Sequence, residues 1–472
     1  MSAISRRSGL LSRGAIAIAI AAASATLAMP AHAAKKEKEA AAPAASKIQM
    51  SKAFQPLAIA AQKSLDDAKK RPDVIAAQQA VTTATNAYNS AQGSAARKAA
   101  MAQREAALAS LLAAFANEKT QIDALKGAAT TPDDNFVAGQ LLSGLGLAAQ
   151  DMKIVRAGYE GMLVSGKYPA ADTPKLQNAI GSICYDLKDF TCAVTQLDAA
   201  LKGGYKGDNT EVLLADSFIQ QGQVQVGLDR LMAGIKARSA AGTVAPQEWY
   251  RRGLSAAYKA KMLDQASAFS NALVEAYPTT ENWAGAISIL RLVAKYEVQE
   301  RLDLMRLMQR TNSFSDTTDY FEFIQAADPR RLPQEVLTVM NAGIAAGKLQ
   351  TSDISVSEAL AQANERVKAE KPTLGSLEKT ATAPTATGNS IAATADALQS
   401  YGEAAKAEAL FRAALAKGGV DVQRVNTRIG IALFDQGKYA EAKAVFDQIT
   451  GIRQPMARLW SVYAAQKMKP AA

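Results

Sequence analysis

The sequence predicts an all-α protein built as a solenoid of stacked helical hairpins, and three observations support this fold class. Strand signals are nearly absent, because no alternating run of Val, Ile, Thr and Tyr is bounded by turn residues. Helix-favouring Ala, Leu, Gln, Glu and Lys dominate nearly every segment instead. Apolar residues recur at positions i, i+3, i+4 and i+7, which is the spacing of one helix face. A hairpin of two such helices cannot bury both of its apolar sides alone, so successive hairpins must stack.

Residues 1–33 have the pattern of a secretory signal peptide. A basic start is followed by an apolar run over residues 15–28, and Ala31-His32-Ala33 supplies a small-residue cleavage site. A transmembrane helix is the alternative, but the apolar run is shorter than the roughly 18–20 residues that cross a bilayer. We therefore expect an exported protein located in a bacterial periplasm, with secretion as the second choice.

The composition narrows the range of functions. The 472 residues include one His and two Cys, and the formal net charge is +10. The histidine, His32, lies in the segment expected to be removed, so the mature chain lacks Ser-His-Asp and Cys-His machinery and the usual zinc and haem ligands. We expect no metal and no cofactor. The charge is modest and not clustered, so we expect no nucleic-acid partner, and no later segment is apolar enough to span a membrane.

The rest of the chain divides by composition into five segments. Residues 34–47 mix Lys, Glu, Ala and Pro and are predicted to be a disordered tether. An Ala-rich N-terminal helical segment follows, with three helices expected at about residues 51–70, 74–91 and 94–125. The predicted segments are 48–130 (N-terminal helices), 131–369 (repeat array), 370–390 (a flexible linker rich in Pro, Thr, Ala and Gly) and 391–472 (a C-terminal repeat pair). A capping helix is expected over 456–467, with its polar side outward.

The hairpins carry a repeating set of small and aromatic residues. The best unit reads GIALFDQGKYAEAKAVFDQI and places its marker residues at Gly430, Gly437, Tyr439, Ala442 and Phe446. A similar unit begins 35 residues earlier, and two units in the middle of the chain are 34 residues apart. This pattern resembles the tetratricopeptide repeat (TPR), whose period is 34 residues. The resemblance implies a right-handed superhelical solenoid with a groove lined by the first helix of each hairpin.

Cys184 and Cys192 lie in one of the middle units, on either side of a predicted hairpin turn near Lys188. Positions equidistant from such a turn can bring their Cβ atoms within disulfide reach, and export to an oxidising compartment favours the bond. The pair is also similar to one that staples single repeats of exported cysteine-rich helical-repeat proteins. Two buried free thiols are the alternative. Redox catalysis is disfavoured, because it normally uses Cys-x-x-Cys.

The TPR resemblance also implies which residues line the groove. Three cations with one tyrosine, at Arg251, Lys259, Arg291 and Tyr258, would form a strip suited to a carboxylate or an acidic peptide. Ordinary surface charge is the alternative for these positions. The groove candidates carried over from the repeat pattern are Asn178, Tyr185, Asp216, Gln220, Arg251, Tyr258, Lys259 and Arg291, with Ser182, Asp186 and Ser255 beside them.

These expectations favour a non-enzymatic scaffold that binds a protein or peptide partner, in envelope assembly or secretion. One alternative is a carrier or sensor of a small molecule or glycan held in the groove. A second alternative is a helical-solenoid enzyme using paired carboxylates. The pairs Asp133-Asp134 and Glu297/Glu300 could be imagined in that role, although a helix start or a solvated face explains them more simply.

Overall fold

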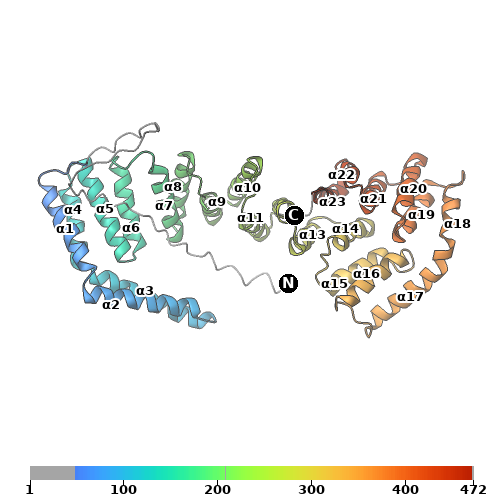
Figure 1. Cartoon of the computed structure of the whole chain (residues 1–472), viewed down its shortest axis with the longest axis horizontal. Coiled ribbons are helices and arrows are strands. Elements are labelled where there is room, and N and C mark those ends of the chain that lie inside the picture. Colours follow the sequence, from blue (N-terminus) through green and yellow to red (C-terminus); the bar gives the residue numbers. More distant parts are fainter. Residues whose placement is uncertain (1–47, 208, 470–472) are drawn as a thin grey trace, which may run out of the picture. The chain divides into compact units, whose positions relative to one another are not determined.

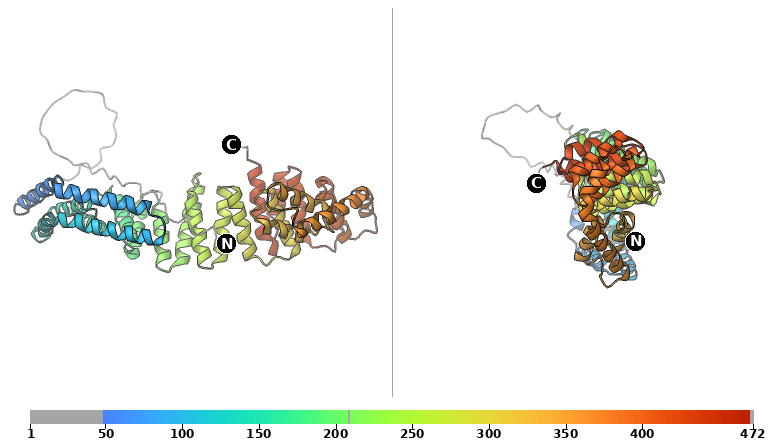
Figure 2. Two further views of the ribbon diagram at one scale, coloured as in Figure 1. Left: turned by 90° about the horizontal axis from the view of Figure 1, so that it is seen from below. Right: turned by 90° about the vertical axis from the view of Figure 1, so that its right-hand side faces the viewer.

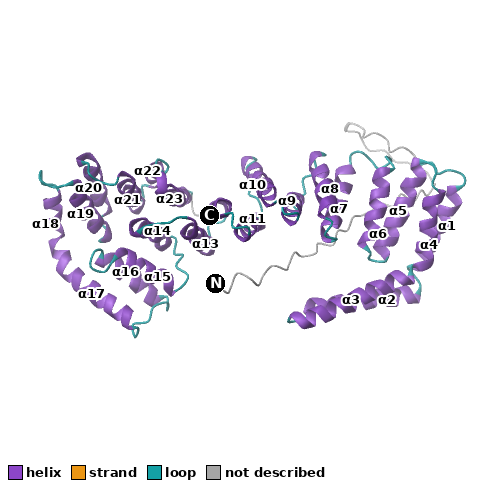
Figure 3. Ribbon diagram, turned by 180° about the vertical axis from the view of Figure 1, so that it is seen from behind, coloured by secondary structure: helices purple, strands orange, loops and turns teal. Residues whose placement is uncertain are grey.

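The computed structural model of the chain describes residues 48–207 and 209–469. Contacts divide the chain into residues 1–48 and 49–472, and the fold below is that of the second unit. The expected signal peptide and tether lie outside the described residues. Every regular element of the described residues is helical (Figure 3), which confirms the predicted fold class. None of the described helices is both long and apolar enough to cross a membrane.

The N-terminal segment consists of four helices rather than the expected three. The helix expected over residues 94–125 is divided at Phe115, whose backbone leaves the helical conformation. The Phe115 ring is fully buried in one core with Phe54 and Leu65, and burial of this large side chain offsets the lost helix continuity. The break allows α4 to pack against α1, while α3 pairs with α2. The helices are α1 (Phe54–Ala68), α2 (Pro72–Ser90), α3 (Ser94–Ala114) and α4 (Ala116–Ala128).

Four helical hairpins follow in chain order (Figure 1). Within each hairpin the two helices pack against each other, and the next hairpin packs on the last, as the neighbouring ribbons of Figure 2 also show. We call the first helix of each hairpin its A helix. The hairpins are α5 (Pro132–Ala148) with α6 (Met152–Val164), α7 (Thr173–Asp186) with α8 (Phe190–Lys202), α9 (Thr210–Gln220) with α10 (Val224–Ala240), and α11 (Gln247–Lys259) with α12 (Leu263–Ala276).

Small residues of the repeat pattern mark the closest helix approaches. A Cβ atom added at Gly181 would lie 2.6 Å from the Leu197 side chain, and one at Gly430 would lie 2.5 Å from the Phe446 ring. Both distances are below van der Waals contact, so any larger residue would push the two helices of the hairpin apart. The packing reason for the small residues is therefore confirmed in a middle unit and in the best-matched unit.

The next part of the chain comprises α13 to α18. The expected flexible linker over residues 370–390 is instead helical along its first half, and Thr387 caps the helix that follows it. Ala381 is buried, and the Tyr401 hydroxyl donates a hydrogen bond to Glu370, so apolar and polar contacts hold this segment on the fold. The elements are α13 (Thr280–Val293), α14 (Val298–Arg310), α15 (Thr317–Ala327), α16 (Pro333–Ala345), α17 (Ile354–Glu370), the 3₁₀ turn η1 (Lys371–Thr373) and α18 (Leu374–Ala381).

The two C-terminal hairpins share one hydrophobic core with α13 to α17 rather than forming a separate unit. The expected capping helix is α23, but it does not only close the array. Its Trp460 is fully buried, and α23 packs against α12 as well as α22. The elements are α19 (Gly388–Ser400), α20 (Ala404–Lys417), α21 (Val422–Asp435), α22 (Tyr439–Phe446), the 3₁₀ turn η2 (Gly451–Arg453) and α23 (Gln454–Lys467).

Helix α14 is enclosed by this arrangement. Its residues 302–308 are all buried, although a helix with one solvent-facing side cannot bury seven residues in succession. Helix α15, the next helix along the chain, packs on α14, and so does α21 from the C-terminal hairpins. The Trp460 indole donates a hydrogen bond to the Asp303 carbonyl. We call this enclosure of α14 by α21 and α23 the C-terminal clasp.

Candidate functional site

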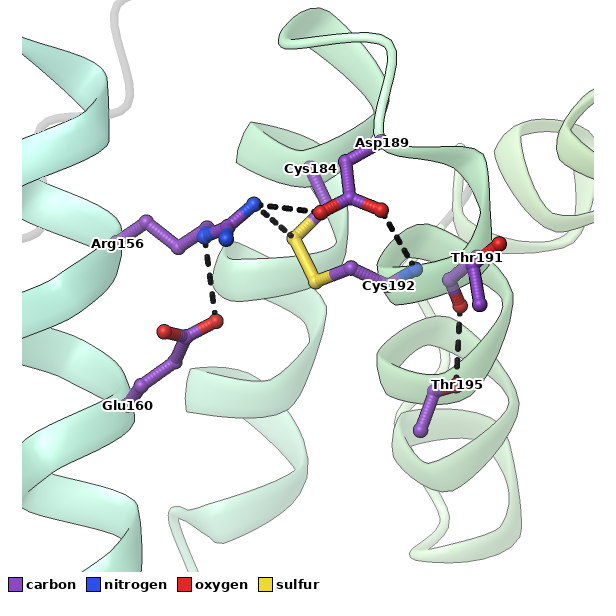
Figure 4. The surroundings of a disulfide bond; sticks show 7 residues. All are labelled: Arg156, Glu160, Cys184, Asp189, Thr191, Cys192 and Thr195. Atoms are coloured by element: carbon purple, nitrogen blue, oxygen red, sulfur yellow. Dashed lines mark hydrogen bonds and ion pairs between the residues drawn. A yellow bond between two sulfur atoms is a disulfide. The ribbon is translucent and has the colours of Figure 1, made fainter.

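The two cysteines form a disulfide within one hairpin, as expected (Figure 4). Cys184 lies near the end of α7 and Cys192 near the start of α8, with Cα atoms 5.8 Å apart. Asp189 caps α8 by accepting a hydrogen bond from the Cys192 backbone N–H, and Arg156 of the preceding hairpin donates to the Asp189 carboxylate at 2.9 Å. Arg156 also donates to the Cys184 sulfur at 3.7 Å. The disulfide therefore staples one hairpin and lies against its neighbour.

The disulfide region also contains a set of potential metal ligands. The side-chain ligand atoms of Glu160, Cys184 and Cys192 lie within 4.8 Å of one another. Both sulfurs are consumed by the disulfide, however, and the Glu160 carboxylate is paired with Arg156 at 3.2 Å. Thiolates, not disulfide sulfurs, bind metals, so in this oxidised state the set is structural.

Several of the groove candidates join one A helix to the next. The Asn178 side chain on α7 accepts a hydrogen bond from Thr210 on α9 at 2.7 Å. The Tyr185 hydroxyl on α7 donates to the Asp216 carboxylate on α9, and Arg252 on α11 donates to the same carboxylate at 3.3 Å. Burial and the Asp216 carboxylate raise the pKa of Tyr185 to about 12. We call this series of contacts the A-helix ladder.

Arg291 also lies between helices. It donates to Asp319 at 2.8 Å and to Glu322, both on α15. Burial raises the pKa of the Asp319 carboxyl, but hydrogen bonds from Ser315 and Arg291 outweigh this effect and hold the pKa below its usual value. The charge of Arg291 is thus neutralised within the fold, and the predicted cationic strip depends on the remaining residues.

Four of the predicted candidates are exposed and take no part in the ladder, namely Gln220, Arg251, Tyr258 and Lys259. The Tyr258 side chain is 45% exposed, which is unusual for a large aromatic residue on a rigid helix. Arg251 has a loose ion pair with Glu281 at 3.8 Å, and both side chains are exposed, so water screens the pair.

The Arg251–Glu281 pair shows that a second exposed stripe adjoins the first, on α13. This stripe was not predicted, although its spacing of i, i+4, i+7 and i+11 is a helical signal. Leu292 in this stripe is 55% exposed, and a Cβ at Gly285 would meet nothing within 4 Å. We call the two stripes together the α11–α13 face, made of Arg251, Ser255, Tyr258, Lys259, Glu281, Gly285, Ser288 and Leu292.

A buried ion cluster holds the C-terminal clasp together. The Asp303 carboxylate on α14 accepts hydrogen bonds from Arg306 at 2.9 Å, Arg453 at 2.7 Å and Arg428 at 3.3 Å. Arg306 makes two further bonds, at 2.8 and 2.7 Å, to the Glu335 carboxylate on α16. Burial raises the pKa of Asp303, but Arg428, Arg306 and Arg453 more than offset it and hold the pKa below its usual value.

The paired carboxylates considered for catalysis have structural partners. Asp134 forms a capping box with Thr131 at the start of α5 and accepts a hydrogen bond from the Ser51 backbone N–H at 2.8 Å. Burial raises its pKa, but these backbone hydrogen bonds lower it to about 2. Glu300 pairs with Arg453 at 2.8 Å, while Glu297 is exposed at the start of α14. The capping hydrogen bonds of Asp134 suit this carboxylate to holding a helix start rather than to proton transfer.

No family model matches the sequence, and no curated protein matches it. Solved structures of helical-repeat proteins do match. The C-terminal part of a TPR repeat-containing protein from Cytophaga hutchinsonii is 10% identical, with 62% of this chain and 98% of that chain covered and a TM-score of 0.26. The pentatricopeptide repeat protein PPR10 from maize is 12% identical, with 88% and 66% covered and a TM-score of 0.28.

A third match is the TPR2AB domain of a yeast protein in complex with pHSP90. It is 13% identical, with 62% of this chain and 94% of that chain covered and a TM-score of 0.22. At these identities and TM-scores, none of the three matches assigns a partner or an activity. The helical-repeat fold rests on the hairpins, their stacking and the small residues between them.

Proposed function

We propose that this chain is a non-enzymatic scaffold that binds a protein or peptide partner through the α11–α13 face. The observation that carries this proposal is the exposure of Tyr258 and Leu292 on the same face as the cations Arg251 and Lys259. The ladder holds α11 through Arg252, and α13 packs against α12. Aromatic residues and arginines of this kind supply most of the binding energy in protein interfaces. Since α11 and α13 both pack against α12, binding requires little ordering of the backbone.

The partner suited to this face carries acidic and apolar side chains. Arg251 and Lys259 provide cations, and Tyr258 and Leu292 provide apolar contact area. Glu281, the one acid among the residues named for this face, is the loose partner of Arg251 and would be displaced from it by a partner carboxylate. An acidic peptide with apolar side chains at helical or extended spacing fulfils these requirements.

We also propose a periplasmic location and a role in envelope assembly or secretion. The pattern of residues 1–33 supports export, and a disulfide within a hairpin is stable in an oxidising compartment. Mass spectrometry of the product from a bacterial host tests this location. We expect a periplasmic protein that begins at Ala34, whereas an uncleaved cytoplasmic chain would contradict it.

The binding proposal is tested by affinity purification from envelope extracts, followed by affinity measurement with the main co-purifying protein. The double variant Arg251→Glu with Lys259→Glu should weaken binding by about ten-fold or more, because it replaces attraction by repulsion. The matched control reverses two exposed lysines outside the face, Lys206 and Lys236, and should bind as the wild type does.

A second variant tests the shape of the α11–α13 face without changing its charge. Gly285→Gln places a side chain in open space on the α11–α13 face and favours the helix intrinsically. It should therefore leave the melting temperature unchanged or higher and still reduce binding. Wild-type affinity in both the charge-reversal and the Gly285→Gln variants would move the binding site away from this face.

A further inference from the structure

A polar cavity of about 260 Å³ lies beside the C-terminal clasp, away from the α11–α13 face. Its walls come mainly from the N-terminal turns of α19 and α21 and the first turn of α14. Arg331, which lies shortly before α16, also lines it. Most small-molecule pockets are lined mainly by hydrophobic side chains, whereas most residues that line this cavity are polar. The polar residues that line it are Gln299, Arg331, Asn389, Asp396, Arg424 and Arg428.

The three arginines of this cavity differ in their partners. Arg428 is neutralised by Asp396 and Asp303. Arg331 and Arg424 have no carboxylate within ion-pair distance among the described residues; Arg331 only approaches the Gln299 side-chain oxygen at 3.4 Å. Burial and the neighbouring Arg428 both lower the pKa of Arg331. Two guanidinium groups thus line one cavity without a direct ion pair among the described residues.

The surrounding helices add to this positive potential. Asn389 and Arg424 lie in the first turns of α19 and α21, and Gln299 lies in the first turn of α14. Helix N-termini carry a partial positive charge that favours anions; at α21 the Asp421 carboxylate, which caps the helix, offsets part of it. The one acid in the cavity wall, Asp396, is already paired with Arg428, and burial raises its pKa. This one carboxylate therefore offsets only part of the positive charge of the three arginines that line the cavity.

We propose that this cavity is a binding site for a small anion, a carboxylate or a phosphate, held between the Arg331 and Arg424 guanidinium groups. Guanidinium matches the planar oxygen pairs of both groups with two parallel hydrogen bonds. The Gln299 and Asn389 amides provide neutral donors beside them. The volume is below the roughly 300–1,000 Å³ of sites for drug-sized ligands, so the site holds a small group rather than a peptide segment. It is independent of the scaffold function proposed above.

Calorimetric titration of the full mature chain tests this site, with inorganic phosphate and succinate as probes and chloride keeping the ionic strength constant. We expect saturable binding of at least one probe at one site per chain. Arg331→Gln and Arg424→Gln should each weaken that binding by about ten-fold or more, since each removes a charged pair of donors. Binding of phosphate alone, succinate alone or both identifies which anion the site accepts.

Matched controls are available beside both arginines. Arg330→Gln changes the neighbouring residue, which is 71% exposed and paired with Asp328, and Arg412→Gln changes an exposed arginine on α20 that pairs with Glu408. Both variants should bind the probe as the wild type does. The proposal is overturned if neither probe binds saturably to the wild type, or if the Arg331 and Arg424 variants bind like these controls.

A cavity-filling variant gives a second, independent measurement. Ala393 lines the cavity and is exposed, so Ala393→Leu occupies part of the space without entering the core. Binding of the probe should be lost while the melting temperature stays within the range of the control variants. Unchanged binding in Ala393→Leu would place the anion outside this cavity and contradict the proposal.

Discussion

The A-helix ladder and the C-terminal clasp both join helices through charged and polar side chains, but their surroundings differ. The ladder connects residues about one repeat apart, such as Tyr185 and Asp216; Asp216 is buried, but its partners Tyr185 and Arg252 are partly exposed. The clasp connects Asp303 to Arg428 and Arg453, which follow it by 125 and 150 residues, and all three side chains are buried. Water can replace a lost partner in the ladder, whereas in the clasp a lost partner leaves a buried charge unpaired.

The two regions also differ in how they depend on the rest of the chain. Each ladder contact belongs to neighbouring hairpins, so the stability of this region is close to a sum of local interactions. The clasp closes a long loop and brings α14, α21 and η2 together, so it forms only when the intervening hairpins are in place. We therefore expect the same type of mutation to have a larger and more cooperative effect in the clasp.

The largest effect is expected for Asp303→Asn. This change leaves Arg306, Arg428 and Arg453 without their shared carboxylate and should lower the free energy of unfolding by about 3–5 kcal/mol. Urea unfolding followed by tryptophan fluorescence measures it, because the buried Trp460 indole is hydrogen-bonded to the Asp303 carbonyl.

The matched control for Asp303 is Asp435→Asn, which also removes the partner of an α14 arginine. Arg310 and Asp435 are bonded at 2.6 Å but partly exposed, so the loss should be about 1 kcal/mol. Equal losses in the two variants would show that burial does not set the cost of removing a carboxylate partner from α14.

An intermediate effect is expected from the disulfide, the one covalent support in the ladder region. The double variant Cys184→Ser with Cys192→Ser should unfold with a free energy about 2–3 kcal/mol lower, because the unfolded chain regains the freedom of a short closed loop. Reducing agent should have the same effect on the wild type and none on the variant. If the unfolding midpoint of the wild type is the same with and without reducing agent, this estimate is contradicted.

A smaller effect is expected for Tyr185→Phe, which removes the hydrogen bond to Asp216 but leaves Arg252 in contact with that carboxylate. We expect a loss of about 1–2 kcal/mol at neutral pH. The folded state raises the pKa of Tyr185 to about 12 from an ordinary value of 10. The contribution of this hydroxyl is therefore fully present below pH 10 and is lost as the pH rises toward 12.

Chemical unfolding of the wild type and of Tyr185→Phe at several alkaline pH values checks this dependence. The difference between the two proteins should shrink between pH 10 and pH 12, and the comparison removes the titration of other groups that both proteins share. A difference that stays constant over this range would mean that the Tyr185 hydroxyl does not contribute through Asp216.

The smallest effect on stability is expected for Arg251→Ala, because its ion pair with Glu281 is long and exposed. The free energy of unfolding should change by less than about 1 kcal/mol, while partner binding falls. A stability loss as large as that of Tyr185→Phe would place Arg251 in the ladder and weaken its assignment to the binding face.

The features predicted correctly from sequence are those that depend on residues close together in the chain. The all-helical class follows from composition and periodicity, and the close approach at Gly430 follows from its spacing to Phe446 within one hairpin. The disulfide was predictable because Cys184 and Cys192 are separated by a single turn. Each of these features depends on residues less than about one repeat apart.

The candidate site was predicted only in part. The repeat pattern identified Arg251 and Tyr258, which are exposed, but it could not show that Arg291 is neutralised by Asp319 and Glu322 of α15. It also gave no reason to select Leu292, because a leucine at helical spacing is more often a core residue. Exposure of a side chain depends on which helices stack against it, and that is decided outside the local pattern.

Most helices, their pairing into hairpins and the disulfide follow from the sequence, since local periodicity, small-residue spacing and a short cysteine separation specify them. The helix break at Phe115, the attachment of residues 370–390 to the fold and the enclosure of α14 depend on tertiary contacts. A buried ion cluster between Asp303, Arg428 and Arg453 joins charges that look like ordinary surface residues in their own segments. Their pairing is fixed by the loop closure that brings α14, α21 and η2 together, and by the desolvation that then requires every charge to have a partner.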